Sequence, residues 1–105
     1  MADTNISMVR GDTLAFGVEF VDLDQDIETA FFSCRRSHEE DLLFQKSLED
    51  GITKVDETHY TVRVAPEDTR NLDAGKYYYD FEVGLNGDIF TILKGVLEIE
   101  QDVTF

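Results

Sequence analysis

Histidine, cysteine and clustered carboxylates are the residue types here that are suited to catalysis or metal binding. The two histidines, His38 and His59, belong to different predicted elements. His38 lies in the polar segment Ser37–Asp41, and His59 is out of phase with the apolar positions after it, so we expect both to face solvent. A hydrolytic site needs a nucleophile, a base and an orienting group in one pocket. We therefore expect no catalytic residues and no enzyme activity.

Cys34 is the single cysteine, so the chain has no internal disulfide, which fits assembly in a reducing cytoplasm. Its alternate neighbours Ala30 and Phe32 are apolar, and an unpaired cysteine in such company behaves as a small core residue. The alternative is a reactive thiol, because Arg35 and Arg36 would lower the pKa of an exposed Cys34.

Four acidic residues at alternate positions form the connection after the first long strand: Asp22, Asp24, Asp26 and Glu28. Calcium is bound by several oxygens at such spacing. The calcium loop of helix–loop–helix proteins is excluded, because Ile27 takes the place of its glycine and Ser33 that of its closing glutamate. Two interpretations stay open, a looser inter-domain calcium site and a solvated acidic turn. We assign no metal ligand and no cofactor.

Arg10-Gly11-Asp12 spells a tripeptide that integrins bind in exposed loops. The tripeptide stands between two predicted strands, where Gly11 permits a bend and Asp12 bonds local backbone. We therefore interpret it as a structural turn with no receptor role.

Net charge excludes two classes of partner. The chain has nine Lys and Arg residues against 23 Asp and Glu residues, which gives a formal charge of −14. Such a charge repels phosphate backbones and anionic membranes, so we expect no nucleic acid and no membrane as partner. No apolar run approaches the roughly 20 residues of a membrane span, and the first residues lack the pattern of a signal peptide. The charge favours solubility, and it also suits a cationic partner surface or a divalent ion.

Alternation of apolar and polar residues with a period of two predicts half-buried strands along most of the chain. These strands are expected near residues 6–9, 14–20, 30–34, 42–48, 60–64, 77–85 and 89–103. The last is expected to place one set of residues on a single face, with a bulge or bend at the glycine: Ile89, Thr91, Leu93, Gly95, Leu97 and Ile99. Asn86-Gly87-Asp88 predicts a hairpin turn and Glu49-Asp50-Gly51 another turn, although the strand after Gly51 is less clear.

One helical turn and one tyrosine define the fold class. Pro66–Leu72 has proline and acids at its start, which predicts a single helical turn between two strands. Tyr77 then stands where immunoglobulin-type sandwiches place the tyrosine corner, although the Cys–Trp–Cys set of antibody domains is absent. We predict an all-β, immunoglobulin-like antiparallel β-sandwich of about seven strands with one short helical turn, a single domain over residues 1–105.

Five groups of residues run in one order along almost the whole chain: Val9–Thr13, Leu43–Ile52, Tyr60–Thr69, Leu72–Asp80 and Gly95–Thr104. Together they resemble small immunoglobulin-like structural proteins of tailed phages and prophages, and are similar to the N-terminal domain of phage baseplate upper proteins. The resemblance implies a non-catalytic virion protein of the tail or baseplate, made in the bacterial cytoplasm. Its implied partners are other virion proteins and, as a homo-oligomer, further copies of itself.

A different function class stays open. A binding module that recognises a cell-surface sugar or a host protein would need an exposed aromatic cluster or a groove, and the sequence offers Tyr78 and Phe31 for it. For either class we expect contacts at the edges of the first and last strands, because unpaired backbone groups can add a neighbour's strand.

Overall fold

The computed structural model describes residues 4–20, 27–37, 39 and 41–102. These residues form eight strands and one short helix: β1 (Ile6–Val9), β2 (Leu14–Glu19), β3 (Thr29–Arg35), β4 (Leu42–Leu48), β5 (Gly51–Lys54), β6 (His59–Val64), α1 (Pro66–Thr69), β7 (Gly75–Leu85) and β8 (Asp88–Glu100). The predicted strands and the helical turn are confirmed, although β8 ends at Glu100 and α1 at Thr69, each short of the predicted bound at residue 103 and Leu72. The uncertain strand after Gly51 is β5, which raises the number from about seven to eight.

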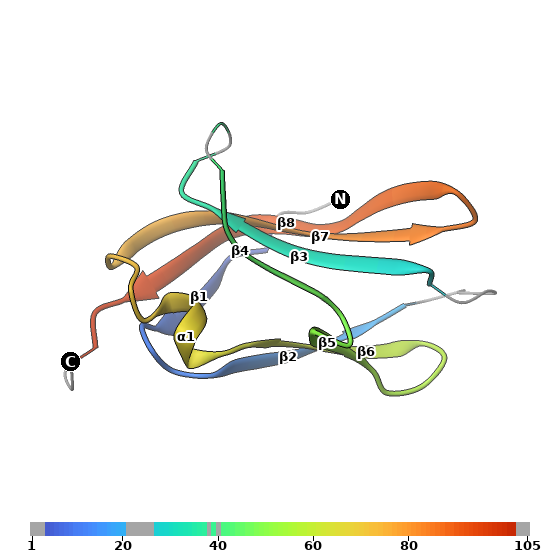
Figure 1. The fold of residues 1–105 in the computed structure, drawn as a ribbon, viewed down its shortest axis with the longest axis horizontal. Helices are drawn as coiled ribbons and strands as arrows, with labels where there is room; N and C mark the ends of the chain where they lie inside the picture. The colour runs from blue at the N-terminus through green and yellow to red at the C-terminus, as the bar shows by residue number, and fades with distance from the viewer. Residues whose placement is uncertain (1–3, 21–26, 38, 40, 103–105) are drawn as a thin grey trace.

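The strands form two facing layers. They are hydrogen-bonded in the order β1-β8-β7-β3-β4-β5-β6-β2. Figure 1 shows that this path folds back on itself, with β8, β7 and β3 in one layer and β2 and β6 in the other. The turn at Glu49 and Asp50 carries the chain between the layers, and α1 connects them at one end of the molecule (Figure 1). The predicted all-β sandwich is therefore observed.

Two strand pairs depart from the antiparallel arrangement that we expected. β1 runs parallel to β8, with Ile6 opposite Leu97, and β4 runs parallel to β5 over a short stretch at Ser47 and Leu48. The other pairs are antiparallel. Alternation reports which side chains are buried and carries no information on strand direction, so the sequence could not show these two pairs.

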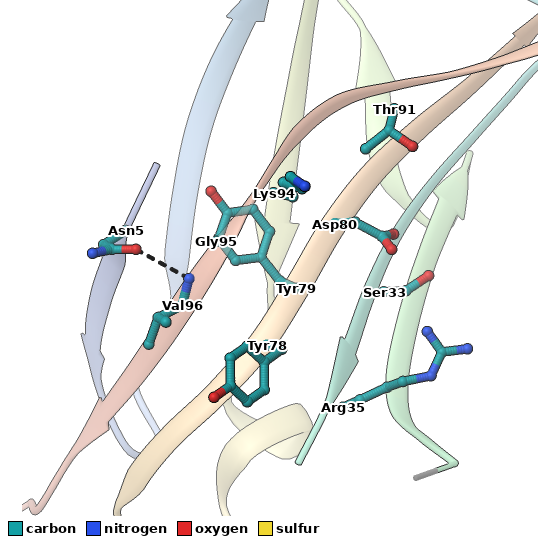
Figure 2. Close-up of a pocket in the computed structure, with 10 residues that line it drawn as sticks. All are labelled: Asn5, Ser33, Arg35, Tyr78, Tyr79, Asp80, Thr91, Lys94, Gly95 and Val96. Carbon is teal, nitrogen blue, oxygen red and sulfur yellow. Dashed lines mark hydrogen bonds between the residues drawn. The ribbon is translucent and has the colours of Figure 1, made fainter. Parts of the chain in front are cut away.

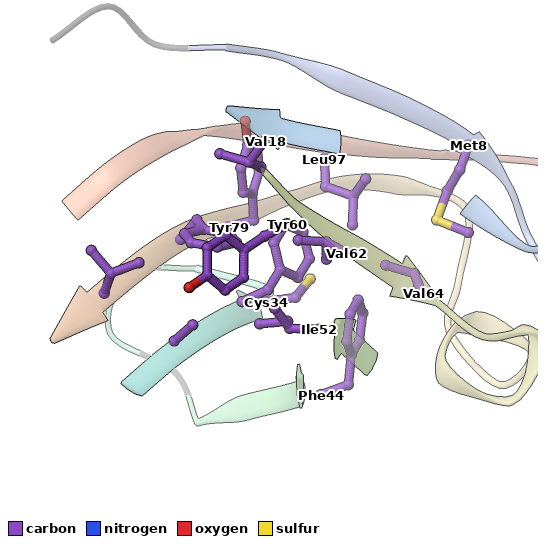
Figure 3. Close-up of a cluster of buried hydrophobic side chains, with 14 of the residues drawn as sticks. Met8, Val18, Cys34, Phe44, Ile52, Tyr60, Val62, Val64, Tyr79 and Leu97 are labelled. Carbon is purple, nitrogen blue, oxygen red and sulfur yellow. The ribbon is translucent and has the colours of Figure 1, made fainter. Parts of the chain in front are cut away.

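The core lies between the two layers, and the alternating positions fill it. Figure 3 shows Met8 and Leu97 from one layer and Ile52 and Val62 from the other directed into the same space. Phe32 is at the centre: its ring stacks on Tyr79 at 5.2 Å between centroids and meets the edge of Phe16 at 5.8 Å. Phe32 is 0% exposed and Phe31 36%, which settles the register of β3 that the sequence left open.

A bulge in β8 changes which residues face outward. The two-residue turn at Asn86 and Gly87 has positive φ at both positions, so the predicted hairpin is confirmed. Further along, Phe81 lies opposite Leu93 while Glu82 lies opposite Thr91, which leaves Ile92 as an extra residue. The expected single face is therefore wrong for Ile89 and Thr91, because the bulge puts them on the outer side of the sheet.

Gly95 has a different role from the bend that we expected, since the register shift lies at Ile92. A Cβ at Gly95 would lie 2.2 Å from the Thr4 carbonyl oxygen. Tyr79 lies directly opposite Gly95, and its hydroxyl donates a hydrogen bond to the same carbonyl. The glycine lets the N-terminal segment pack closely against β8.

Buried polar bonds fasten the end of the sandwich at α1. The Tyr77 hydroxyl donates to the Asp73 carbonyl at 2.6 Å, which confirms the predicted tyrosine corner. Nε and Nη2 of Arg10 both donate to Oδ1 of Asp102, at 3.1 and 2.9 Å. The Gly11 amide donates to the hydroxyl of buried Thr69 at 2.9 Å. We call these residues the helical end, and they confirm that Arg10-Gly11-Asp12 is a structural turn.

A second ion pair connects α1 to β4. Nζ of Lys46, on β4, lies 2.6 Å from Oδ2 of Asp68, and both side chains are mostly buried. The same Asp68 oxygen accepts a hydrogen bond from the Ala65 amide at 2.7 Å, at the start of the helix. A single carboxylate therefore caps the helical turn and anchors it to the neighbouring strand.

Candidate interaction surface

The outer side of β3, β7 and β8 carries four cross-strand rows of side chains. The register gives Thr29–Gly84–Ile89, Phe31–Glu82–Thr91, Ser33–Asp80–Lys94 and Arg35–Tyr78–Val96. β4 adds one residue beside each of the last three rows: Ser47, Gln45 and Leu42. We call this set of residues the docking face.

A hollow of about 400 Å³ opens in the middle of the docking face. Figure 2 shows Ser33, Asp80 and Lys94 around it, with Arg35 and Tyr78 along its lower side. At the rim beside β1 the Val96 amide donates to Oδ1 of Asn5 at 3.1 Å (Figure 2). The lining is mixed: it has one carboxylate, two cations, the amide of Asn5, the hydroxyls of Ser33 and Thr91, and two tyrosines.

Asp80 is the residue of the hollow with unused bonding capacity. Its Oδ1 atom is inaccessible to solvent and has no hydrogen-bond partner among the residues that the structure describes. Burial raises the pKa of the Asp80 carboxyl, and the Arg35 charge opposes that rise. Buried acceptors are normally paired, so the unpaired Oδ1 atom is an unfavourable feature of the free protein.

Apolar side chains surround this polar centre. Phe31 is 36% exposed, Leu42 39% and Tyr78 36%, while Ile89 reaches 63%. Phe31 and Tyr78 stand in the rows on either side of Asp80. An exposed apolar cluster around a few polar groups is typical of a binding surface.

The docking face is also electrically neutral in an acidic protein. Asp80 and Glu82 carry its negative charges, and Arg35 and Lys94 carry its positive charges. The charges within the four rows cancel, although the chain as a whole carries −14.

His59 lies on a different part of the surface, in a small ionic cluster. Its Nδ1 lies 2.8 Å from Oδ1 of Asp56 and its Nε2 3.1 Å from Oε2 of Glu19. The hydrogen bond to Asp56 raises the pKa of His59, while bonds from Thr58 and His59 lower the pKa of Asp56 to about 2. The cluster is exposed, as the alternation predicted. The other histidine, His38, lies outside the described residues.

Cys34 is a core residue. Its side chain is fully buried beside Phe32 and Tyr79, and burial raises the pKa of its thiol to about 12. The predicted core thiol is confirmed. The reactive alternative is wrong, because burial outweighs any influence of Arg35 and Arg36 on the pKa.

The acidic turn is described only at its last member. Asp22, Asp24 and Asp26 lie outside the described residues, whereas Glu28 accepts a hydrogen bond from the Asn86 amide at 2.5 Å. In the part of the chain that the structure describes, no group of three His, Cys, Asp or Glu side chains is placed to hold a metal ion. Over those same residues, α1 is the one helix, and it is too short to span a membrane.

The sequence did not single out Ser33, Asp80 and Lys94 as a group. Their one signal was a polar residue at an outward position of each strand, which every solvated strand shows. The group depends on the register between β3, β7 and β8, and the bulge at Ile92 shifts that register by one residue.

The strand order and the tyrosine corner define an immunoglobulin-like β-sandwich, as the sequence predicted. No protein-family model and no curated protein matches this sequence. Solved structures share the fold. A domain of the endo-β-1,4-mannanase from Thermotoga petrophila aligns with a TM-score of 0.63 and 14% identity, over 96% of this chain and 18% of that chain.

Two further structures align over most of their own length. The natural killer cell receptor NKp44 has a TM-score of 0.58 at 15% identity, over 95% of this chain and 100% of that one. The extracellular domain of the voltage-gated sodium channel β4 subunit has a TM-score of 0.52 at 14% identity, over 96% of this chain and 93% of that one. At these identities the likeness shows the fold alone.

Proposed function

We propose that this chain is a non-catalytic assembly domain that binds a protein partner through the docking face. The observation that carries the proposal is the exposure of Phe31 and Tyr78 on either side of a polar hollow that Asp80 and Lys94 line. Protein interfaces concentrate their binding energy at such centres, where apolar groups exclude water around a polar contact. A partner that covers the two rings and reaches the polar groups of the hollow would remove this centre from water.

The fold comparisons support this use of the sandwich by analogy. The sodium channel β4 domain forms parallel homodimers that explain its role in cell–cell adhesion, and NKp44 is a triggering receptor. The β4 domain is thus an example of such a sandwich that acts through contacts between copies of itself.

The setting that we propose is a phage or prophage particle, in its tail or baseplate. The ordered resemblance along the sequence supports this setting, and the partners are then other virion proteins and further copies of this chain. Catalysis is not part of the proposal. The described histidine, His59, is bound by two carboxylates at the surface, and the thiol of Cys34 is buried.

Immunogold electron microscopy of particles tests the setting. The prophage of the source bacterium is induced, particles are purified on a density gradient, and they are probed with gold-labelled antibody to this chain. We expect label at one fixed position on the particle. Antigen that stays in the lysate while the particles remain unlabelled would refute the virion assignment.

Incorporation of variants tests the docking face itself. Asp80→Lys with Glu82→Lys reverses two charges of the face, and Arg63→Glu with Arg70→Glu reverses two exposed charges on β6 and just after α1. We expect the first variant to be absent from particles and the control to be incorporated. Equal incorporation of both would show that assembly uses another surface.

A sugar-binding module is the second candidate, and one observation favours it. Phe31 and Tyr78 lie exposed on the same face and flank a polar hollow, which is an arrangement able to stack on a sugar ring and bond its hydroxyls. Screening the protein on an array of bacterial cell-wall glycans tests this candidate. Binding that is lost in Phe31→Ala with Tyr78→Ala would favour it over the assembly role.

A further inference from the structure

We infer that the occupant of the docking face is a second copy of this chain, which docks face to face about a two-fold axis. This inference rests on the proposed function and adds the identity of the partner. Four properties of the face support it: its neutral charge, its balance of opposite charges, the placement of its basic residues and its exposed apolar side chains.

Charge is the first argument. Two copies that each carry −14 repel one another wherever their acidic surfaces meet. Like charges placed together across an interface strongly disfavour it. On the docking face Asp80 and Glu82 are matched by Arg35 and Lys94, so two such faces approach without net repulsion.

Symmetry is the second argument. A two-fold interface brings the same patch of both subunits together, so the patch must be complementary to itself. Equal numbers of cations and anions within one patch meet that requirement, because each can find its opposite on the other copy. A cationic partner would instead be expected to select a wholly acidic patch, which this face is not.

The placement of the basic residues is the third argument. Arg10 and Lys46 are held in ion pairs with Asp102 and Asp68, and Arg36 lies over the Tyr77 ring at 4.7 Å. Those three cations contribute to other parts of the fold. Arg35 and Lys94 line the hollow of the docking face, where the Arg35 charge acts on Asp80 of the same face. Because these two cations lie on the same face as Asp80 and Glu82, cations of one copy can pair with carboxylates of the other.

Exposed apolar area supplies the attraction between the copies. Phe31, Tyr78 and Ile89 are exposed on the docking face and would be removed from water by an equivalent surface. In a two-fold interface centred on the hollow, the polar groups that line it, Asp80 and Lys94 among them, face the same groups of the second copy.

Paired charge-reversal variants test this inference with the full chain in analytical ultracentrifugation. The acidic variant carries Arg35→Glu and Lys94→Glu, and the basic variant carries Asp80→Lys and Glu82→Lys. We expect the wild type to be a dimer and each variant alone to be a monomer, with a dimer dissociation constant raised at least about 100-fold. An equimolar mixture of the two variants should again form a dimer, because opposite faces now attract.

A matched control separates the docking face from total charge. Arg63→Glu with Arg70→Glu makes the same change in net charge as the acidic variant, at exposed positions outside the face. We expect this control to stay dimeric. Circular dichroism and a thermal melt establish whether each variant is folded. If a double variant is not folded, the single variants Lys94→Glu and Glu82→Lys are used for the mixing test instead.

Three results would overturn the inference: a monomeric wild type at all concentrations, a control that dissociates as readily as the acidic variant, or a mixture that stays monomeric. A monomeric wild type whose docking-face variants are still excluded from particles would leave the proposed function standing with a different partner. If the wild type is monomeric and the docking-face variants are also incorporated into particles, the face is not a binding surface.

Discussion

The helical end and the docking face each hold a carboxylate with one buried, unpaired oxygen, and they differ in what surrounds it. At the helical end, Asp102 is mostly buried, its Oδ1 accepts two bonds from Arg10, and its Oδ2 has no partner among the described residues. On the docking face, Asp80 opens onto a hollow, and its buried Oδ1 atom has no partner among the described residues. The first region uses its polar groups to hold the fold together. The second places its polar groups around an open hollow, where a bound partner can contact them.

Removing Arg10 should have the largest effect and would test whether the helical end stabilises the fold. Arg10→Ala leaves the buried carboxylate of Asp102 unpaired, which should lower the free energy of unfolding by about 3 to 5 kcal/mol. Urea denaturation followed by circular dichroism measures this loss. Arg63→Ala, at an exposed position, should change stability by no more than about 0.5 kcal/mol. If Arg10→Ala also changed the free energy of unfolding by no more than about 0.5 kcal/mol, the ion pair at the helical end would not stabilise the fold.

Removing the hydroxyl of the tyrosine corner should have an intermediate effect. Tyr77→Phe keeps the ring beneath Arg36 and deletes the hydrogen bond to the Asp73 carbonyl. We expect a loss of about 1 kcal/mol in the free energy of unfolding. Asp73→Ala keeps the carbonyl acceptor and serves as control, so it should lose less than Tyr77→Phe does. The reverse order would mean that the Asp73 side chain matters more than the bond.

Asp80→Asn should have the smallest effect and the opposite sign. The pKa of Asp80 is raised in the fold, so the stability linked to its protonated form is complete below its unfolded pKa, about 3.9. That stability is lost as pH rises through the folded value. The amide introduced by Asp80→Asn cannot ionise and escapes the loss, so the variant should melt above the wild type at neutral pH.

Thermal melts from pH 3 to pH 8 measure this difference at low protein concentration, where copies are apart. The gap in Tm should be least at the acid end and reach a plateau once wild-type Asp80 is fully ionised. Glu67→Gln, on the exposed side of α1, controls for the loss of one negative charge. A variant that is less stable than the wild type at neutral pH would show that Asp80 supports the fold, as Asp102 does.

The sequence predicted the interior of this protein better than its surface. Period-two alternation placed Tyr60, Val62, Tyr79 and Phe81 in the core, because a strand with one dry face must alternate. The tyrosine corner was predictable for a related reason: the helical turn and Gly75 place Tyr77 near the start of its strand.

The docking face could not be predicted from the sequence, because neighbouring residues of the face come from different strands. Ser33 and Lys94 are far apart in the sequence and become neighbours of Asp80 only through the register of three strands. The extra residue Ile92 shifts that register, and nothing in an alternating run marks where a bulge falls. Local patterns therefore report burial, while the candidate site depends on pairing over long distances.

The parallel pair of β1 and β8 also decides how the protein resists force. A pull between Thr4 and Asp102 drags β1 and β8 in opposite directions along their length, since the two strands run the same way. Their hydrogen bonds lie across this direction and are loaded together in shear, whereas a hairpin pulled open loses its bonds one at a time. The Arg10–Asp102 ion pair adds a further contact at the end of this strand pair. When the domain is pulled, we expect the rupture of the β1–β8 pair to set the rate of unfolding.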